Sequence, residues 1–287
     1  MTIFFEKHVF WICIAVAAGA FGALLFLHGF LYLPAEGAGR EAPVATTSLS
    51  YAFDAGGMIQ ETEQQDARNP DWWLNSGGSF VITEGTGKTI QGELLPLHRW
   101  RLAYLFTNPV DTDNGYHPQN VFRLVSRNVW MNPQMSVSFR IVRDNLTDSP
   151  NRNESNGVFL MNRYIDGDNL YYAGIRVDGT AVIKKKYHGV YRTLAQAPLF
   201  AGSYGRDAMP NLLPHSEWIE LTSRTMDDPD GSVVIDLFMR RAGETEPSLI
   251  LKAADTDPIL GKAAVGIRTD FMDVEIKDIR ISETAVH

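Results

Sequence analysis

Cysteine is almost absent from this chain. Cys13 is the only one in 287 residues, and it lies inside an apolar run close to the first residue. A lone cysteine excludes an intrachain disulfide framework and a thiolate metal site. The chain after this run is free of cysteine, which suits an oxidising compartment.

An excess of positive charge is also lacking. The chain has 26 Lys and Arg residues against 34 Asp and Glu residues, so its formal net charge is −8. A nucleic-acid-binding domain usually carries a basic stripe. The charge balance therefore predicts no nucleic-acid partner.

Internal repeats at a fixed period and long amphipathic helix patterns are missing as well. What remains is a series of short β-rich runs separated by Gly, Pro, Asn and Asp. Residues 49–287 are enough for one large all-β domain. A single two-sheet antiparallel sandwich is the most economical fold for them.

One long hydrophobic run is present, and it precedes that domain. Residues 10–27 read FWICIAVAAGAFGALLFL, and His28 is the only interruption before Leu33. A run of about 18 or more apolar residues can span a bilayer as a helix, whereas a signal-peptide core has about 7–15. We predict that residues 1–33 form a cytoplasmic stub and a transmembrane signal anchor.

The orientation of this anchor follows from the charges around it. Lys7 precedes the run, while Glu36, Arg40 and Glu41 follow it, so the bias toward a cytoplasmic N-terminus is small. Residues 34–48 are rich in Ala, Gly, Thr and Pro, which predicts a linker. The domain at 49–287 is then extracytoplasmic, either periplasmic or on the cell surface. Small residues at 35–38 leave cleavage of the anchor open.

The domain is organised around residues 156–194. Four β-rich runs occur there, each closed by a turn: residues 158–164, 170–177, 180–187 and 190–194. Turns every eight to twelve residues indicate an antiparallel meander in a sandwich or barrel. Asp178-Gly179 is a two-residue hairpin signal, because both positions must tolerate positive φ.

A two-residue loop at this hairpin also predicts the register. Ile175 would pair with Val182 on the core face, and Tyr172 would pair with Lys185 on the opposite face. That second face would hold Tyr172, Arg176 and Lys185 around the bare backbone of Gly174, where a ligand could approach. The alternative is a solvated outer face with lysines that extend into water.

A wider pattern of residues carries a family resemblance. It comprises Gly157, Arg163-Tyr164, an acidic turn, Asn169, Tyr171-Tyr172, Asp178-Gly179, Lys185, Gly189, Leu194 and the closing stretch GKAAVGIRTDFMDVEIKDIRI at 261–281. This pattern resembles the concanavalin A-like lectin/glucanase jelly rolls, in their laminin-G-like and 3-keto-disaccharide-hydrolase-like branches. The E-x-D-x-E motif of the β-glucanase branch is absent.

The resemblance implies an all-β, two-sheet antiparallel jelly-roll sandwich. It also implies that an aspartate on the last strand helps to hold a structural calcium ion between the chain ends. Asp278 occupies that position, and Asp54 near the first strand is a candidate second ligand.

Two adjacent tryptophans precede the meander. Successive side chains of a strand point to opposite faces, so one of Trp72 and Trp73 should pack in the core. The other is a candidate platform for stacking on a sugar ring, and burial of both is the alternative.

An irregular segment follows at 99–119. Its DTDNG sequence, residues 111–115, alternates carboxylates as a calcium loop does. It lacks the glycine expected at the sixth loop position and has Phe122 in place of the bidentate glutamate, so a plain Asx-rich turn is the other interpretation. His117 and Gln119 lie close to Arg123 in the next predicted strand, as a polar cluster.

These features predict a membrane-anchored domain that binds a polysaccharide. Clustered guanidinium and ammonium groups suit carboxylated or sulfated glycans, because guanidinium binds a carboxylate at two points. Lys184 belongs to the same set of cations. The candidate binding residues are Trp72, Trp73, Arg123, Arg163, Tyr172, Arg176 and Lys185.

Two other function classes stay open. A polysaccharide lyase needs a cation for the uronate carboxylate and a His or Tyr to move the proton. His117, Arg123 and Tyr172 resemble fragments of the alginate-lyase motifs. A hydrolase needs two carboxylates about 5–9.5 Å apart, and nothing in the sequence pairs Glu61, Glu63, Asp166 or Asp168. A structural or protein-binding envelope domain would need none of this chemistry.

Overall fold

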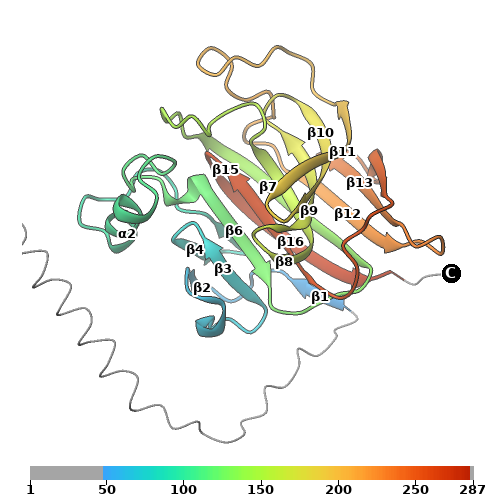
Figure 1. The fold of residues 1–287 in the computed structure, drawn as a ribbon. Coiled ribbons are helices and arrows are strands. Elements are labelled where there is room, and N and C mark those ends of the chain that lie inside the picture. Colours follow the sequence, from blue (N-terminus) through green and yellow to red (C-terminus); the bar gives the residue numbers. More distant parts are fainter. Residues whose placement is uncertain (1–47, 285–287) are drawn as a thin grey trace, which may run out of the picture. The chain divides into compact units, whose positions relative to one another are not determined.

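The structure is a computed structural model that describes residues 48–284 (Figure 1). The predicted anchor at 1–33 and nearly all of the predicted linker lie outside the described residues. Within 48–284, no helix is long and apolar enough to cross a membrane. All described residues belong to one compact unit, Pro43–His287.

Strands from distant parts of the chain build the first sheet. They are β1 (Ser48–Tyr51), β2 (Gly57–Gln60), β4 (Ser79–Thr83), β5 (Thr86–Lys88), β7 (Pro133–Asp144), β12 (Ile219–Asp227), β13 (Val233–Arg241), β14 (Ser248–Asp255) and β16 (Met272–Glu283). The order of this nine-stranded sheet is β14-β13-β12-β7-β16-β5-β4-β2, and β1 pairs with β16.

The second sheet contains the predicted meander. Its strands are β3 (Trp72–Ser76), β6 (Val121–Ser126), β8 (Gly157–Asp166), β9 (Asn169–Arg176), β10 (Thr180–Tyr187), β11 (Val190–Pro198) and β15 (Ala264–Asp270). The order of this seven-stranded sheet is β11-β10-β9-β8-β15-β6-β3. The four strands predicted between 156 and 194 are confirmed as β8 to β11.

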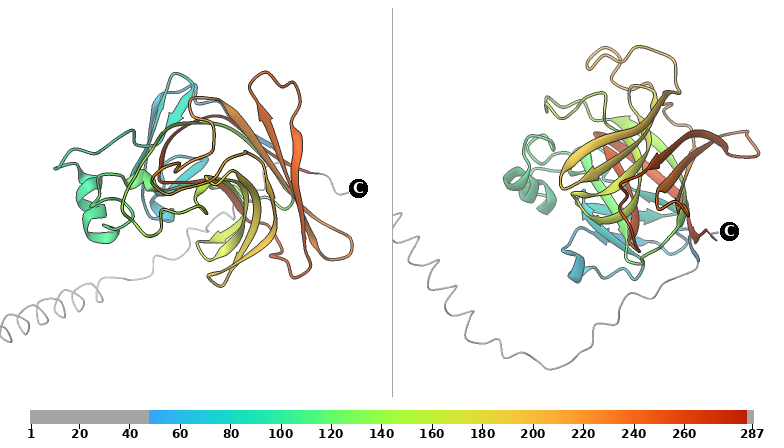
Figure 2. Two further views of the ribbon diagram at one scale, coloured as in Figure 1. Left: turned by 90° about the horizontal axis from the view of Figure 1, so that it is seen from above. Right: turned by 45° about the vertical axis from the view of Figure 1, so that its right-hand side comes forward.

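All pairings between these strands are antiparallel. Figure 2 shows the two sheets from two further directions as the layers of a sandwich. The predicted two-sheet antiparallel sandwich is therefore confirmed.

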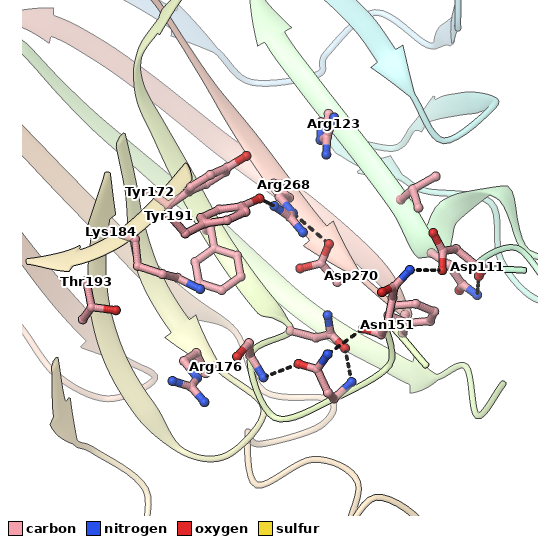
Figure 3. A pocket seen from close by; sticks show the side chains of 17 residues that line it. Asp111, Arg123, Asn151, Tyr172, Arg176, Lys184, Tyr191, Thr193, Arg268 and Asp270 are labelled. Carbon is pink, nitrogen blue, oxygen red and sulfur yellow. Dashed lines mark hydrogen bonds and ion pairs between the residues drawn. The ribbon is translucent and has the colours of Figure 1, made fainter. Parts of the chain in front are cut away.

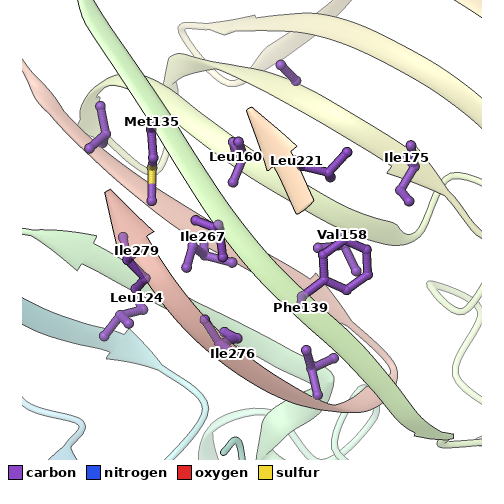
Figure 4. Packing of buried hydrophobic residues seen from close by; sticks show 14 of the residues in the cluster. Leu124, Met135, Phe139, Val158, Leu160, Ile175, Leu221, Ile267, Ile276 and Ile279 are labelled. Atoms are coloured by element: carbon purple, nitrogen blue, oxygen red, sulfur yellow. The ribbon is translucent and has the colours of Figure 1, made fainter. Parts of the chain in front are cut away.

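Alternation along each strand produces the core between the layers. In β16, Val274 and Ile276 are buried in the main hydrophobic cluster, while Glu275 between them points out and pairs with Arg140. The second sheet contributes Leu124, Leu160 and other inward residues, which meet those of the first sheet (Figure 4). Both hydrophobic clusters and all the strands lie in the Pro43–His287 unit, so a fragment that begins at Pro43 keeps every contact of the sandwich.

The predicted register of the central hairpin is wrong by one residue. Ala181, not Val182, faces Ile175, and Lys184 faces Tyr172. The connection therefore has three residues, 177–179, with Gly179 at a φ of 79°, a common hairpin loop with a bulge. Val177 is withdrawn from the ladder because its N–H donates to Asn156 O and its carbonyl accepts from Leu212 N.

This shift changes which lysine faces outward. The side-chain period of a strand is two, so a one-residue slip moves every side chain of the strand to the other face. Lys184 lies on the outer face with Tyr172, and Lys185 lies on the inner face with Tyr171. The sequence-based placement of Lys185 beside Tyr172 and Arg176 is corrected accordingly.

Within residues 48–284, helical structure is limited to short elements between strands. These are η1 (Gln64–Asp66), α2 (Arg99–Thr107) and η2 (Pro118–Asn120). In α2, the side chain of His98 caps the N-terminus by accepting from Trp100 N. Figure 1 shows α2 beside the sandwich, outside both sheets.

Candidate functional site

A hollow of about 510 Å³ lies on the outer face of the seven-stranded sheet (Figure 3). Side chains from β6, β8, β9, β10, β11 and β15 line it, together with loop residues that include Asp111 and Asn151. We call this hollow the groove. One half of each alternating pattern lies in the main core, and the groove residues belong to the outward half, where a second buried cluster includes Phe159 and Tyr172.

Aromatic rings form one wall of the groove. Tyr172 from β9 and Tyr191 from β11 stack, with ring centroids 6.2 Å apart and an interplanar angle of 26°. Phe159 from β8 packs edge-on against Tyr172 at 6.0 Å. Tyr172 and Phe159 are each only 2% exposed, whereas Tyr191 is 50% exposed, so Tyr191 is the ring of this wall that can meet the apolar face of a sugar.

Phe159 also covers the position at which an open backbone was expected. A Cβ atom on Gly174 would lie 2.2 Å from Val158 O and 2.9 Å from Phe159 Cδ1. Gly174 is thus required for close packing of β9 on β8. The expectation that it leaves room for a ligand is wrong.

Four cations line the groove, and two of them are already paired. Arg268 Nε donates to Asp270 Oδ1 at 2.8 Å. Arg176 Nη2 lies 2.8 Å from Asp178 Oδ2, and its Nε donates to Glu154 O. The carboxylates of Asp270 and Asp178 therefore neutralise these two guanidinium groups in the absence of a ligand.

The other two cations, Arg123 and Lys184, have no carboxylate or hydrogen-bond partner within residues 48–284. Figure 3 shows both side chains without a dashed contact, whereas Arg268 lies between Tyr191 and Asp270. Lys184 Nζ is 5.1 Å from the Phe159 ring centroid, within the range of a cation–π contact. The groove thus presents two charges that nothing in the described chain neutralises.

Ionisation in the groove reflects this concentration of positive charge. Burial, together with the charges of Arg268 and Arg176, lowers the pKa of Lys184 to about 8. Burial alone would raise the pKa of the Tyr191 hydroxyl, but Arg268, Lys186 and Arg123 outweigh burial and lower it. Burial raises the pKa of Tyr172. The two stacked phenols therefore differ in acidity.

Three of the residues selected from the sequence meet in the groove: Arg123, Tyr172 and Arg176. Their common location could be anticipated for Tyr172 and Arg176, which alternate on one strand. Arg123 comes from β6, two strands away from β8 across β15. Only the sheet order brings it to the same face.

The two tryptophans divide as predicted, but neither lines the groove. Trp72 is fully buried in the main core. Trp73 points to the outer face near the β3 edge, where it is only 8% exposed. Its Nε1 donates to Thr62 O at 2.8 Å, and its ring packs edge-on against Tyr164 at 6.4 Å. The packing of one tryptophan in the core is confirmed. Trp73 is buried as well, so the alternative of burial of both holds and Trp73 is not an exposed stacking platform.

Two selected cations have structural partners instead. Arg163 is fully buried, and its guanidinium contacts Asp227 Oδ1 at 2.7 Å and Ile259 O at 2.6 Å. Lys185 Nζ lies 3.0 Å from Asp255 Oδ2 and also contacts Asp257. Both side chains hold loops against the sandwich. The bulge in β8 turns Arg163 away from the groove, and Lys185 points inward with Tyr171, opposite to Lys184.

The lyase combination is incomplete in this structure. Arg123 and Tyr172 line the groove, but His117 does not. His117 is buried at the start of η2, with its Nδ1 3.7 Å from Asp113 Oδ2, and burial lowers its pKa. Gln119 is equally engaged, since its amide donates to Asp273 Oδ1. The polar cluster predicted around His117 supports the loop.

The carboxylates considered for hydrolysis lie outside the groove. Glu61 accepts hydrogen bonds from Tyr104 Oη and Gly78 N, both at 2.7 Å, and burial raises its pKa. It shares a smaller hollow of about 270 Å³ with Glu63 and Trp73. Asp168 pairs with Lys186 in the turn between β8 and β9.

The DTDNG segment folds as an Asx-rich turn. Asp111 accepts hydrogen bonds from Ser149 Oγ at 2.7 Å, Asn151 Nδ2 at 2.9 Å and Asn108 Nδ2 at 3.1 Å. Burial would raise the pKa of this carboxyl, but the three donors outweigh it and lower the pKa. Its oxygens are thus already occupied by protein donors.

The described part of the chain contains no cluster of metal-binding side chains. Among residues 48–284, no group of three or more His, Cys, Asp or Glu side chains is placed to hold a metal ion. Asp54 and Asp278 are both exposed, and Asp278 lies at a bulge of β16 with a φ of 53°. Structural calcium at Asp54 and Asp278 therefore stays a prediction.

Sequence reasoning missed several groove residues: Phe159, Tyr191, Thr193 and Arg268. Arg268 and Asp270 are two residues apart in the closing stretch, so the sequence could have placed both side chains on the same face of a strand. Tyr191 and Thr193 alternate in the same way in β11. What could not be read from the sequence is that β11 and β15 present these residues to one hollow.

Comparison with known proteins finds matches among solved structures. No family model matches the chain, and no curated protein matches it. One aligned structure is carbohydrate-binding module CBM66 from Bacillus subtilis, at 10% identity and a TM-score of 0.45, covering 73% of this chain and 94% of that one. Another is the exoplasmic/lumenal domain of VIP36 with Ca²⁺ and Man3GlcNAc bound, at 9% identity and a TM-score of 0.46, covering 76% and 88%.

A β-glucanase from Bacillus licheniformis also aligns, at 10% identity and a TM-score of 0.44, covering 84% of this chain and 100% of that one. The two-sheet fold is shown by the strand pairing of this chain itself. We take no ligand or activity from these proteins.

Proposed function

We propose that the groove binds an acidic glycan, with uronate carboxylates or sulfate groups as the charged determinants. The observation that carries this proposal is the presence of two unpaired cations, Arg123 and Lys184, beside the stacked Tyr172 and Tyr191. A partly buried cation without a partner is unfavourable, and an anionic ligand removes that penalty. Tyr191, the exposed ring of the aromatic wall, supplies the contact for the sugar rings.

The net negative charge of the chain does not oppose this assignment. The potential at a site depends on where charges lie, and a walled hollow concentrates it. Arg123, Lys184, Arg176 and Arg268 meet in the groove against Asp111 and Asp270. Arg123 can bind a carboxylate at two points, while Lys184 acts as a compact point charge.

Calorimetry tests the proposal on the fragment that begins at Pro43. The probes are a linear oligouronate and a neutral glucan oligosaccharide of the same length. We expect Arg123→Ala to lower the affinity for the oligouronate by about ten- to a hundredfold, the usual loss of a charge-assisted hydrogen bond. The loss should be smaller for the neutral glucan, and wild-type binding should weaken as salt rises.

Arg280→Ala on the other sheet is the matched control. It removes the same side chain, but Glu220 keeps Arg240 as a partner. Unchanged affinity in Arg123→Ala, or failure of the wild-type fragment to bind the oligouronate, would reject the groove as an acidic-glycan site.

A lyase is the second candidate function, and Tyr191 is the observation that favours it. Its lowered pKa and its contact with Arg268 Nη1 at 3.4 Å suit a phenolate base beside a cation. In such a β-elimination, Tyr191 would take the proton from C5 of the uronate. The C4–O glycosidic bond would break as a C4=C5 double bond forms, and the leaving oxygen would gain a proton from water. Arg123 would neutralise the carboxylate in the transition state.

Ultraviolet absorption of the unsaturated product distinguishes this reaction from binding alone. If the groove is a lyase site, Tyr191→Phe should abolish product formation while it keeps the affinity for the oligouronate within a few-fold. Absence of product from wild-type protein after long incubation leaves the binding function and discards the lyase.

Membrane anchoring through residues 1–33 is part of the proposal. The apolar run from Phe10 to Leu27 supports it, and the domain would lie on the outer side. Protease added to intact cells, or to spheroplasts where an outer membrane encloses a periplasm, should then digest the domain. Protection in both preparations, with digestion only after lysis, would reverse the orientation.

A further inference from the structure

The most exposed apolar side chains of residues 48–284 gather around one short helix. Leu97, Phe106 and Leu95 are 86%, 83% and 77% exposed, the three highest values among the large hydrophobic residues. Leu102 and Val110 in the same segment are also exposed. We call Leu95, Leu97, Leu102, Phe106 and Val110 the α2 patch. Several large apolar side chains of one surface segment in water normally mark an interaction site.

The helix directs its apolar side away from the domain. Tyr104 is its only buried residue, and its hydroxyl hydrogen-bonds with Glu61 and Gly77. Trp100 Nε1 donates to Gln60 at 2.9 Å. Trp100 and Tyr104 therefore attach one side of α2 through polar contacts. Leu102 and Phe106, also four residues apart, share another side, which is exposed.

The segment is also locally basic. From Leu94 to Val110 it contains Arg99 and Arg101 but no Asp or Glu, in a chain whose net charge is −8. Arg99 lies over the Trp100 ring at 4.3 Å, and Arg101 lies over the Tyr116 ring at 4.1 Å. Neither has a carboxylate partner in the described part of the chain. Apolar residues bordered by unpaired arginines complement an anionic lipid surface.

We propose that the α2 patch docks onto a lipid bilayer, with Leu95, Leu97 and Phe106 inserted at the level of the headgroups. The proposal shares the predicted anchor with the proposed function but does not depend on glycan binding. Fourteen residues, 34–47, separate the predicted span from β1. A chain of that length reaches at most about 50 Å. The domain therefore stays close to the bilayer, where a weak interfacial contact is effective.

Docking would also orient the groove. Asp111 directly follows Val110 of the patch and lines the groove. The Asp111 end of the groove would then face the membrane, and its ligand would be a glycan close to the bilayer surface.

Co-sedimentation with vesicles tests the docking. The protein is the fragment that begins at Pro43, which lacks the predicted anchor and keeps the whole sandwich. The vesicles are phosphatidylcholine alone, or phosphatidylcholine mixed with phosphatidylglycerol. We expect the fragment to bind the mixed vesicles. The double variant Leu97→Ser/Phe106→Ser should lose at least about tenfold in partition, because two inserted side chains are removed.

Matched variants separate the apolar and the charged contributions. Leu249→Ser/Leu260→Ser removes two exposed leucines elsewhere on the domain and should leave partition unchanged. Arg99→Gln/Arg101→Gln should weaken binding to the mixed vesicles more than to phosphatidylcholine. Circular dichroism of each variant confirms that the sandwich is retained.

The proposal is overturned if the wild-type fragment sediments with neither vesicle, or if Leu97→Ser/Phe106→Ser binds as well as wild type. Sedimentation velocity tests the alternative that a second copy of the chain covers the α2 patch. A dimer that dissociates in the same double variant, without any lipid binding, would assign the patch to a second copy of the chain. Because none of these substitutions lies in the groove, glycan affinity should be unaffected, so this proposal and the proposed function can fail separately.

Discussion

The outer faces of both sheets carry cations, but the two faces differ in how these cations are paired with carboxylates. On the nine-stranded sheet, six cations pair with three carboxylates, and Lys277, which has no carboxylate partner in the described residues, lies over the Trp218 ring. Glu275 pairs with Lys88 and Arg140, Glu220 pairs with Arg240 and Arg280, and Asp236 pairs with Arg224 and Lys252. On the seven-stranded sheet, Arg123 and Lys184 have no such partner in the described residues.

This difference separates a solvated face from a binding face. Exposed ion pairs contribute only about 0–1 kcal/mol each, and they keep a flat sheet surface soluble. Unpaired cations in a hollow beside aromatic rings contribute nothing to such a surface and lower the stability of the free protein slightly. Their charge becomes favourable when a ligand supplies the anion.

The largest effect on the free energy of unfolding is expected from substitution of the two lysines on opposite faces of β10. Lys185→Met should lower the free energy of unfolding by about 3–5 kcal/mol, because it leaves the buried carboxylate of Asp255 without its cation. Lys184→Met, one residue earlier, should leave the free energy of unfolding almost unchanged or raise it. Urea denaturation of both variants measures the difference.

A double variant provides the control for this comparison. Lys185→Met/Asp255→Asn removes the orphaned charge together with its partner, so it should recover part of the lost stability. Equal losses for Lys184→Met and Lys185→Met would mean that the register of the hairpin differs from the one described.

An intermediate effect is expected from the ionisation of Lys184. Its pKa in the folded protein is lowered to about 8, so the side chain loses its charge as pH rises through that value. Affinity for an oligouronate should therefore fall by up to about tenfold between about pH 7 and pH 9. Lys184→Arg keeps its charge over this range and should remove the dependence. Calorimetry at several pH values measures both.

The same ionisation should affect stability in the opposite direction. The unfolded chain binds a proton on this lysine up to its ordinary pKa of 10.5, so between about pH 8 and pH 10 it binds more protons than the folded protein. The contribution of Lys184 to the free energy of unfolding therefore rises with pH in that window. If the affinity for the oligouronate stays constant between about pH 7 and pH 9, Lys184 does not contact the ligand.

The smallest effect is expected on the nine-stranded sheet. Arg280→Ala should change the free energy of unfolding by about 0–1 kcal/mol, because its side chain is exposed and Arg240 still pairs with Glu220. Glycan affinity should not change. A large loss of affinity in this variant would contradict the assignment of this face as a solvated surface.

The fold could be predicted because its signals are local. Turn residues between the β-rich runs of residues 156–194 marked the four strands β8 to β11. The same local logic divided Trp72 from Trp73. It failed at the central hairpin, where Asp178-Gly179 indicated a two-residue loop. Hydrogen bonds from Val177 to Asn156 and Leu212, both distant in sequence, produce a three-residue loop instead.

The amino-acid sequence by itself determined the alternation of the strands, the positions of most turns and the presence of aromatic and cationic residues on outward faces. Only the tertiary structure decided which of these residues form the groove. Register assigned Lys184 to the groove and Lys185 to an ion pair with Asp255, because a shift of one residue reverses the faces of a strand. Sheet order then brought Arg123 from β6 and Arg268 from β15 beside the tyrosines of β9 and β11, and such contacts between distant segments leave no local signal in the sequence.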